Sequence, residues 1–166
     1  EESAMEEYVF GANILENLTT GMYQDSRVIY REYIQNACDQ IDKAYDMGLL
    51  RDEEGCIDIW FDAENRTVSI VDNATGIPSV DFERTLADIA NSDKRLGEDK
   101  GFRGIGRLCG LAYCKELIFT SKAAGEDVIS IMHCDAAKMR ELIIANERGE
   151  KHTASEVLHS IYKFEY

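Results

Sequence analysis

The spacing of apolar and polar residues in "REYIQNACDQIDK", residues 31–43, predicts an amphipathic helix. At about 100° per residue, the apolar positions fall on one stripe. That stripe is Tyr30, Ile34, Ala37, Ile41 and Tyr45. A second, polar stripe carries Glu32, Asn36, Asp39 and Lys43. This polar stripe is either a solvated face with acid–base pairs or one wall of a site, and Asn is unusual there because it is a mediocre helix former.

Periodicity along the rest of the chain predicts alternating groups of helices and hairpin-linked strands. A mobile, charged loop is expected over 91–103, because this stretch lacks periodicity. The order of elements predicts an α+β fold, a two-layer sandwich with a mixed β-sheet and helices on one face. The expected helices are 9–22, a helix from an Asp25 or Ser26 cap to Gly48, 79–90, 105–113 and 136–146, and the expected strands are 56–62, 67–72, 116–122, 128–135 and 160–166.

Composition narrows the class of protein. With 166 residues, 45% of them hydrophobic and 30% charged, the chain has globular proportions and contains no apolar run of the length of a membrane span. The formal charge of −14 argues against a broad nucleic-acid surface, although a local pocket could still hold an anionic ligand. The chain opens with Glu, which indicates a processed or excised piece, so residues 1–4 are left outside the expected fold.

The cysteines and histidines do not predict a metal site. Five cysteines, at 38, 56, 109, 114 and 134, show no C-x-x-C spacing, and His133, His152 and His159 are not at ligand spacing with them. Four of the cysteines have apolar neighbours, as expected for small buried side chains in a reducing, cytoplasmic protein.

Two loops carry candidate chemistry. In "IVDNATGIP", residues 70–78, Asp72 at the end of a strand presents a carboxylate and Gly76 allows a close approach, although Asp-Asn with Gly is also ordinary turn chemistry. In "GFRGIGRLCG", residues 101–110, three glycines lead into a helix and expose N–H groups, or let that helix pack closely. No strand precedes these glycines and no Walker A sequence occurs, so neither a dinucleotide fold nor a P-loop is predicted.

The chain contains three motifs in a fixed order: E-x-x-x-N-x-x-D, then D-x-x-x-G, then G-x-x-G-x-G. In the order of these motifs the chain resembles the GHKL ATPases. That family groups gyrase B, the 90 kDa heat-shock chaperones, sensor histidine kinases and MutL, and the chain is most similar to the chaperone class. The resemblance covers about residues 14–121, including "NRTVSIVDNATGI" and "FERTLADIANS". It implies a Bergerat-type fold that binds ATP or ADP with Mg²⁺.

The resemblance also implies roles for individual residues. Glu32 is expected to activate the attacking water, Asn36 to coordinate Mg²⁺, and Asp72 to accept a hydrogen bond from the adenine amino group. Residues 91–103 correspond to the lid over the nucleotide. Further nucleotide contacts are expected from Asp39, Gly76, Ile77, Ser92, Lys94, Gly101, Arg103, Gly104, Ile105 and Gly106.

The implied function is an ATPase domain over residues 5–166 that hydrolyses slowly alone and acts as a conformational switch for a larger protein with further C-terminal domains. ATP-dependent homodimerisation and an unknown protein client or effector are implied partners. Two alternatives remain: a nucleotide-sensing interaction module without hydrolysis, and the catalytic domain of a sensor kinase. One departure from the family is Ala74, which stands where a glycine is usual and would strain a backbone that needed positive φ.

Overall fold

The computed structural model describes residues 25–87, 106–149 and 152–166 of the chain. The helix expected over 9–22 and the loop expected over 91–103 lie outside these ranges. The described elements, in chain order, are α2 (Val28–Asp46), β1 (Ile57–Asp62), β2 (Thr67–Asp72), α3 (Ser79–Ala87), the 3-10 helix η3 (Gly106–Ala112), β3 (Glu116–Ser121), β4 (Ser130–Asp135), α4 (Ala136–Glu147), α5 (Ala154–Ile161) and β5 (Tyr162–Glu165).

Helix α2 follows the predicted apolar stripe. Its buried residues are Ala37, Ile41 and Ala44, in the middle and last turns of the helix. It ends as the sequence predicts at Gly48, where φ is +70°. The N–H of Gly48 donates to the carbonyl of Tyr45, and the N–H of Leu49 donates to the carbonyl of Ala44, which together form a Schellman motif.

The start of α2 differs from the prediction of a cap at Asp25 or Ser26. The N-cap residue is Arg27, whose side chain makes no capping bond. The carboxylate of Asp25 instead accepts from the backbone N–H of Arg27 at 3.0 Å and forms an ion pair with its guanidinium at 2.6 Å. The acid therefore orders the turn before the helix and leaves the first helical N–H groups uncapped by a side chain.

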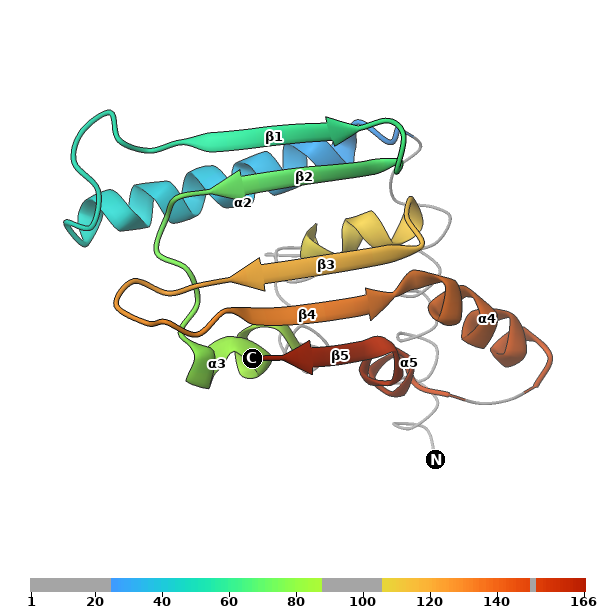
Figure 1. Ribbon diagram of the computed structural model, residues 1–166. Coiled ribbons are helices and arrows are strands. Elements are labelled where there is room, and N and C mark those ends of the chain that lie inside the picture. The colour runs from blue at the N-terminus through green and yellow to red at the C-terminus, as the bar shows by residue number, and fades with distance from the viewer. Residues whose placement is uncertain (1–24, 88–105, 150–151) are drawn as a thin grey trace, which may run out of the picture.

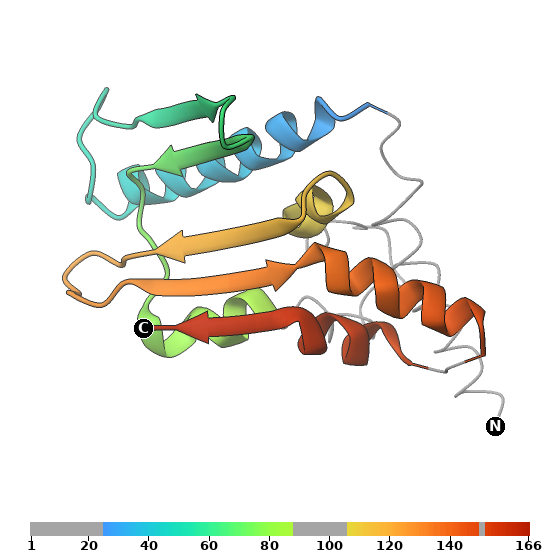
Figure 2. The same ribbon diagram turned by 45° about the vertical axis from the view of Figure 1, so that its right-hand side comes forward.

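The α+β class is confirmed, and all described strand pairs are antiparallel. Among the described residues the strands form two sheets, β1–β2 and β3–β4–β5, where one mixed sheet was predicted. The strands follow one another in the order of their numbers in both views, and α2 runs behind β1 and β2 (Figures 1 and 2).

The core lies on one face of the β3–β4–β5 sheet. Alternate residues of β4, such as Met132 and Cys134, are fully buried, while the side chain of Ile118 on the other face of β3 is 48% exposed. Helices α3, η3, α4 and α5 cover the buried face. Their buried residues in this cluster are Phe82, Leu86, Leu108, Leu111, Ala136, Met139, Ala154, Val157, Leu158 and Ile161.

The β1–β2 hairpin is less buried and presents one face to α2. The ring of Phe61 lies 6.1 Å from the ring of Tyr30 on α2, between centroids. Because successive side chains of a strand point to opposite faces, Trp60 points away from α2, and it is 67% exposed.

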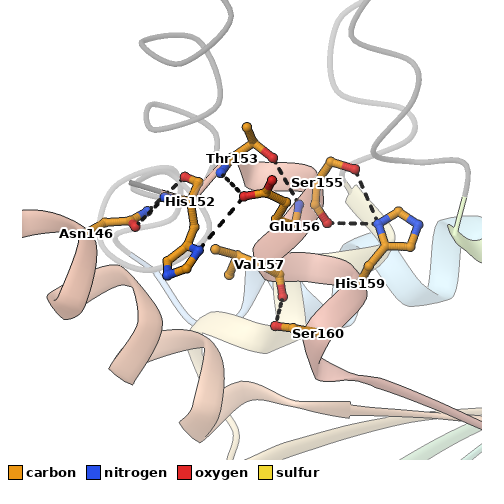
Figure 3. Close-up of polar contacts among 8 residues, drawn as sticks. All are labelled: Asn146, His152, Thr153, Ser155, Glu156, Val157, His159 and Ser160. Atoms are coloured by element: carbon orange, nitrogen blue, oxygen red, sulfur yellow. Dashed lines mark hydrogen bonds and ion pairs between the residues drawn. The ribbon is translucent and has the colours of Figure 1, made fainter. Parts of the chain in front are cut away.

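Helix α5 was not predicted; only a strand over 160–166 was expected at this end of the chain. The hydroxyl of Thr153 accepts from the N–H of Glu156 at 3.1 Å, and the carboxylate of Glu156 accepts from the N–H of Thr153 at 3.0 Å (Figure 3). This reciprocal capping box begins the helix. The side chain of Asn146 also bridges both backbone groups of His152, so the end of α4 is tied to the start of α5.

The segment predicted as a short helix over 105–113 is a 3-10 helix, η3, over Gly106–Ala112. None of the helices in the described part of the chain combines the length and the hydropathy of a membrane span.

Candidate functional site

The polar stripe of α2 has a half-buried part and an exposed part. Glu32 and Asn36 are half-buried, whereas Asp39 and Lys43 are exposed. The carboxylate of Asp39 accepts from the side-chain amide of Gln35 at 3.0 Å, a contact along the helix surface. Glu32 and Asn36 therefore form the part of the stripe that faces other elements.

Glu32 points to the start of η3. A Cβ built on Gly106 would lie 2.8 Å from Oε2 of Glu32, so a larger residue there would displace the end of this carboxylate side chain. Burial raises the pKa of Cys109 in the same 3-10 helix to about 11, and the nearby Glu32 charge adds to the shift. Glu32 therefore lies beside the start of η3.

Three side chains hold η3 in place, and sequence reasoning had assigned none of them a role. The hydroxyl of Tyr33 donates to the carbonyl of Arg107 at 2.7 Å and accepts from the N–H of Gly110 at 3.0 Å. The guanidinium of Arg107 donates to the carbonyl of Thr85 in α3 at 3.2 Å.

From α4, the guanidinium of Arg140 donates to the carbonyls of Leu111 and Cys114 at 3.0 and 2.8 Å. The 3-10 helix is thus bonded to α2, α3 and α4. Because these contacts join residues far apart in the sequence, no local spacing signals them.

The loop after β2 is ordered by its own side chains. Oδ1 of Asp72 accepts from the N–H of Ala74 at 3.0 Å, which leaves the second carboxylate oxygen for another donor. The side chain of Asn73 accepts from the N–H of Cys56 and donates to the carbonyl of Glu54, both at 2.8 Å. The loop is therefore tied back to the start of β1.

Gly76 is required where the loop meets the turn between β3 and β4. Its φ is +65°, and an added Cβ would lie 2.2 Å from the carbonyl oxygen of Lys122. Beside it, the N–H of Ile77 donates to the hydroxyl of Ser121 at 2.7 Å. The described residues other than glycine with positive φ are Glu53 and Arg66, so Ala74 carries none of the strain that the sequence had raised as a concern.

Asp72 lies on the same side of the hairpin as α2. It pairs with Ile57 across the β1–β2 ladder, so its side chain shares a face with those of Ile57, Ile59 and Phe61. Glu32 and Gly106 are therefore neighbours, while Asp72 lies at the end of β2 on the face of the hairpin toward α2. Six predicted contact residues lie outside the described ranges: Ser92, Lys94, Gly101, Arg103, Gly104 and Ile105.

Glu32 and Asn36 are the candidate metal-binding side chains on α2. Within residues 25–87, 106–149 and 152–166, no group of three or more His, Cys, Asp and Glu could hold a metal ion. Mg²⁺ commonly keeps several waters and takes one or two protein oxygens together with substrate phosphates. The half-buried side chains of Glu32 and Asn36 carry oxygen donors of this kind.

Comparisons with known proteins identify the family. A family model described as histidine kinase-, DNA gyrase B-, and HSP90-like ATPase matches residues 25–163. The chain is 30% identical over 132 residues to the chaperone protein HtpG of Helicobacter hepaticus, covering 69% of this chain and 21% of that protein. It is 28% identical over 140 residues to HtpG of Bacillus velezensis, covering 75% of this chain and 22% of that protein. It is 31% identical over 130 residues to HtpG of Bacillus licheniformis, with coverage of 69% and 21%.

The chain spans about a fifth of the length of these relatives. The family model covers α2, the loop after β2 and η3, the three elements that carry the described candidate site residues. The chain therefore belongs to the histidine kinase-, DNA gyrase B- and HSP90-like ATPase family.

Proposed function

We propose that the chain binds Mg²⁺–ATP between α2, the loop at residues 72–77 and the start of η3, and hydrolyses it. The observation that carries this proposal is the approach of the Glu32 carboxylate to Gly106, where a Cβ would lie 2.8 Å from Oε2. This contact would bring a proton acceptor to the backbone at the end of the glycine loop, where the phosphates are proposed to bind.

Asp72 is the proposed adenine contact. Its Oδ1 holds the N–H of Ala74, and its second oxygen is left to accept from the exocyclic amino group of adenine. Guanine has a carbonyl oxygen at that position, so two acceptors would face each other and the site would prefer ATP over GTP.

Asn36 and Gly106 are the proposed contacts to the metal and phosphates among the described residues. The side-chain oxygen of Asn36 supplies one ligand to Mg²⁺, and the bound ion neutralises phosphate charge. The contacts proposed for Ser92, Lys94, Gly101, Arg103, Gly104 and Ile105 remain predictions from the sequence. Asp39 is exposed and hydrogen-bonded to Gln35, so we propose that it supports the nucleotide site and takes no part in the reaction.

Glu32 is the proposed base. It accepts a proton from water as the water oxygen bonds to the γ-phosphorus, and the bond from that phosphorus to the bridging oxygen breaks, giving ADP and inorganic phosphate. Positioning and charge neutralisation supply most of the rate, as in other phosphoryl transfers.

For the larger protein, we propose that the ATP cycle acts as a conformational switch through an ATP-dependent homodimer. The relatives are named as chaperone proteins, which favours a protein client over other effectors. A cytoplasmic location is proposed on the same grounds.

Calorimetric titration with ATP, ADP and GTP, with and without Mg²⁺, tests the binding site. Asp72→Asn is a sharp control, because the Asn oxygen can still accept from Ala74 while its amide group opposes the adenine amino group. We expect Mg²⁺-sensitive adenine-nucleotide binding that Asp72→Asn weakens at least about tenfold, the cost of one misplaced hydrogen bond. No binding at millimolar nucleotide would contradict the proposal.

Turnover separates hydrolysis from nucleotide sensing. Glu32→Gln should retain ATP binding and lower the rate constant of hydrolysis by about 10²-fold or more, within the range for loss of a general base. Binding of ATP by the wild-type chain without any hydrolysis would favour the alternative of a nucleotide-sensing module.

A further inference from the structure

Tyr33 connects the helix that carries Glu32 to the 3-10 helix that begins at Gly106. Its hydroxyl both donates to the carbonyl of Arg107, at 2.7 Å, and accepts from the N–H of Gly110, at 3.0 Å. Burial raises the pKa of Tyr33 far above its usual range, so the hydroxyl keeps the proton that it donates to Arg107.

The contact is close on the side of η3. A Cβ on Gly110 would lie 2.7 Å from the hydroxyl oxygen of Tyr33 and 3.2 Å from Cδ1 of Leu117. Gly106, four positions earlier, lies similarly close to the Glu32 carboxylate. Two adjacent residues of α2 therefore each face a glycine of η3, and both contacts change together if η3 shifts.

We propose that Tyr33 is a positioning residue, whose hydroxyl fixes the placement of the Gly106 backbone against the Glu32 carboxylate. The inference rests on the proposed ATPase function and deepens it. Loss of the hydroxyl frees η3 from α2, so Glu32 and the phosphates lose their mutual alignment. The adenine contact at Asp72 is on a separate loop, so nucleotide affinity depends on Tyr33 less than turnover does.

Tyr45 provides a matched control on the same helix. Its hydroxyl accepts from the N–H of Gly55 at 2.7 Å, and a Cβ on Gly55 would lie 2.5 Å from that oxygen. Tyr45 lies about 18 Å along α2 from Tyr33, given a rise of about 1.5 Å per residue. Tyr45→Phe therefore removes a comparable phenol–glycine bond far from η3.

The test compares Tyr33→Phe with Tyr45→Phe in the full 166-residue chain. We expect both variants to lower the midpoint of urea unfolding, and only Tyr33→Phe to reduce kcat, by about tenfold or more, while the KM for ATP changes less than about threefold. Amide exchange measured by NMR should speed up at Gly110 in Tyr33→Phe and at Gly55 in Tyr45→Phe.

The possible failures are distinguishable. Equal kcat values in the two variants, or a change confined to KM, would overturn the positioning role while leaving the ATPase function intact. Unchanged exchange at Gly110 in Tyr33→Phe would also overturn it, without reference to activity. A wild-type chain that does not turn over ATP overturns the proposed hydrolysis and this inference together.

Discussion

At the scale of single residues, Gly76 joins the loop after β2 to the turn that follows β3. Its left-handed backbone alone would make alanine unfavourable, but the carbonyl of Lys122 adds a steric conflict, since an added Cβ would lie 2.2 Å away. The same loop contains Ala74 without positive φ, so the position that the family usually fills with glycine needs none here.

We therefore expect Gly76→Ala to reduce the free energy of unfolding by at least about 3 kcal/mol, because backbone strain and a clash with backbone add together. Gly125→Ala is the matched control: φ is +80° there, with nothing within 4 Å of an added Cβ. It should cost only about 1 kcal/mol. Urea unfolding of both variants checks the difference, and equal losses would mean that the loop moves away from Lys122.

Residue-level predictions from the sequence succeeded where one residue type has a strong local preference. Gly48 ends α2, and Asp72 closes β2 with its carboxylate in the turn. The roles of Tyr33 and Arg140 could not be predicted, because their hydrogen-bond partners lie in η3, and only the folded chain brings these groups together.

At the scale of elements, α5 is a short helix that was not predicted. It has only eight residues and runs directly into β5, although its buried residues, Ala154, Val157, Leu158 and Ile161, follow a helical repeat. The spacing Thr-x-x-Glu at 153–156, which forms a complete capping box, was a second signal in the sequence. Helix α2, with 19 residues, was predictable because its periodicity extends over several turns, and the two hairpins because their alternating strands flank recognisable turns.

Thr153→Ala should lower the free energy of unfolding by about 1 kcal/mol, the usual cost of an N-cap, because alanine lacks the hydroxyl that accepts from the N–H of Glu156. Ser155→Ala, two positions later inside the helix, should change stability by less than about 0.5 kcal/mol. Thermal unfolding monitored by circular dichroism distinguishes the two variants. A Thr153 variant as stable as the wild type would show that packing alone begins α5.

At the scale of the whole molecule, the two sheets are joined by side chains and loops. The N–H of Ala124 donates to the carbonyl of Thr75 at 3.3 Å, and the N–H of Ile77 donates to the hydroxyl of Ser121. Helix α2 and η3 complete the connection through Tyr33. The sequence predicted a mixed sheet and could not predict this division, because strand patterns show which residues alternate but not which edges pair.

The buried thiols of the core should lower the free energy of unfolding at alkaline pH. Burial raises the pKa of Cys109 to about 11 and of Cys134 to about 12, from an ordinary value of 9.0. Above pH 9 the unfolded chain loses these protons while the folded chain keeps them. The free energy of unfolding therefore has its full value below pH 9 and decreases as the pH rises toward 11–12.

Urea unfolding under reducing conditions from pH 8 to about 10.5 should therefore show a steady loss of free energy. Cys134→Ala should make this loss less steep, whatever its own effect on packing. Cys56→Ser is the control, because Cys56 is exposed and its replacement should leave the slope unchanged. A pH-independent free energy of unfolding would contradict the burial of both thiols.

The orientation of Trp60 has a spectroscopic consequence. It is the single tryptophan of the chain, and its indole points away from α2 with 67% of the residue exposed. Emission from native protein should thus already be red-shifted and readily quenched by acrylamide, so denaturation changes it little. Any macromolecule that covers this face of the hairpin would instead shift the emission to the blue, which makes the unlabelled chain its own fluorescent reporter of association at β1 and β2.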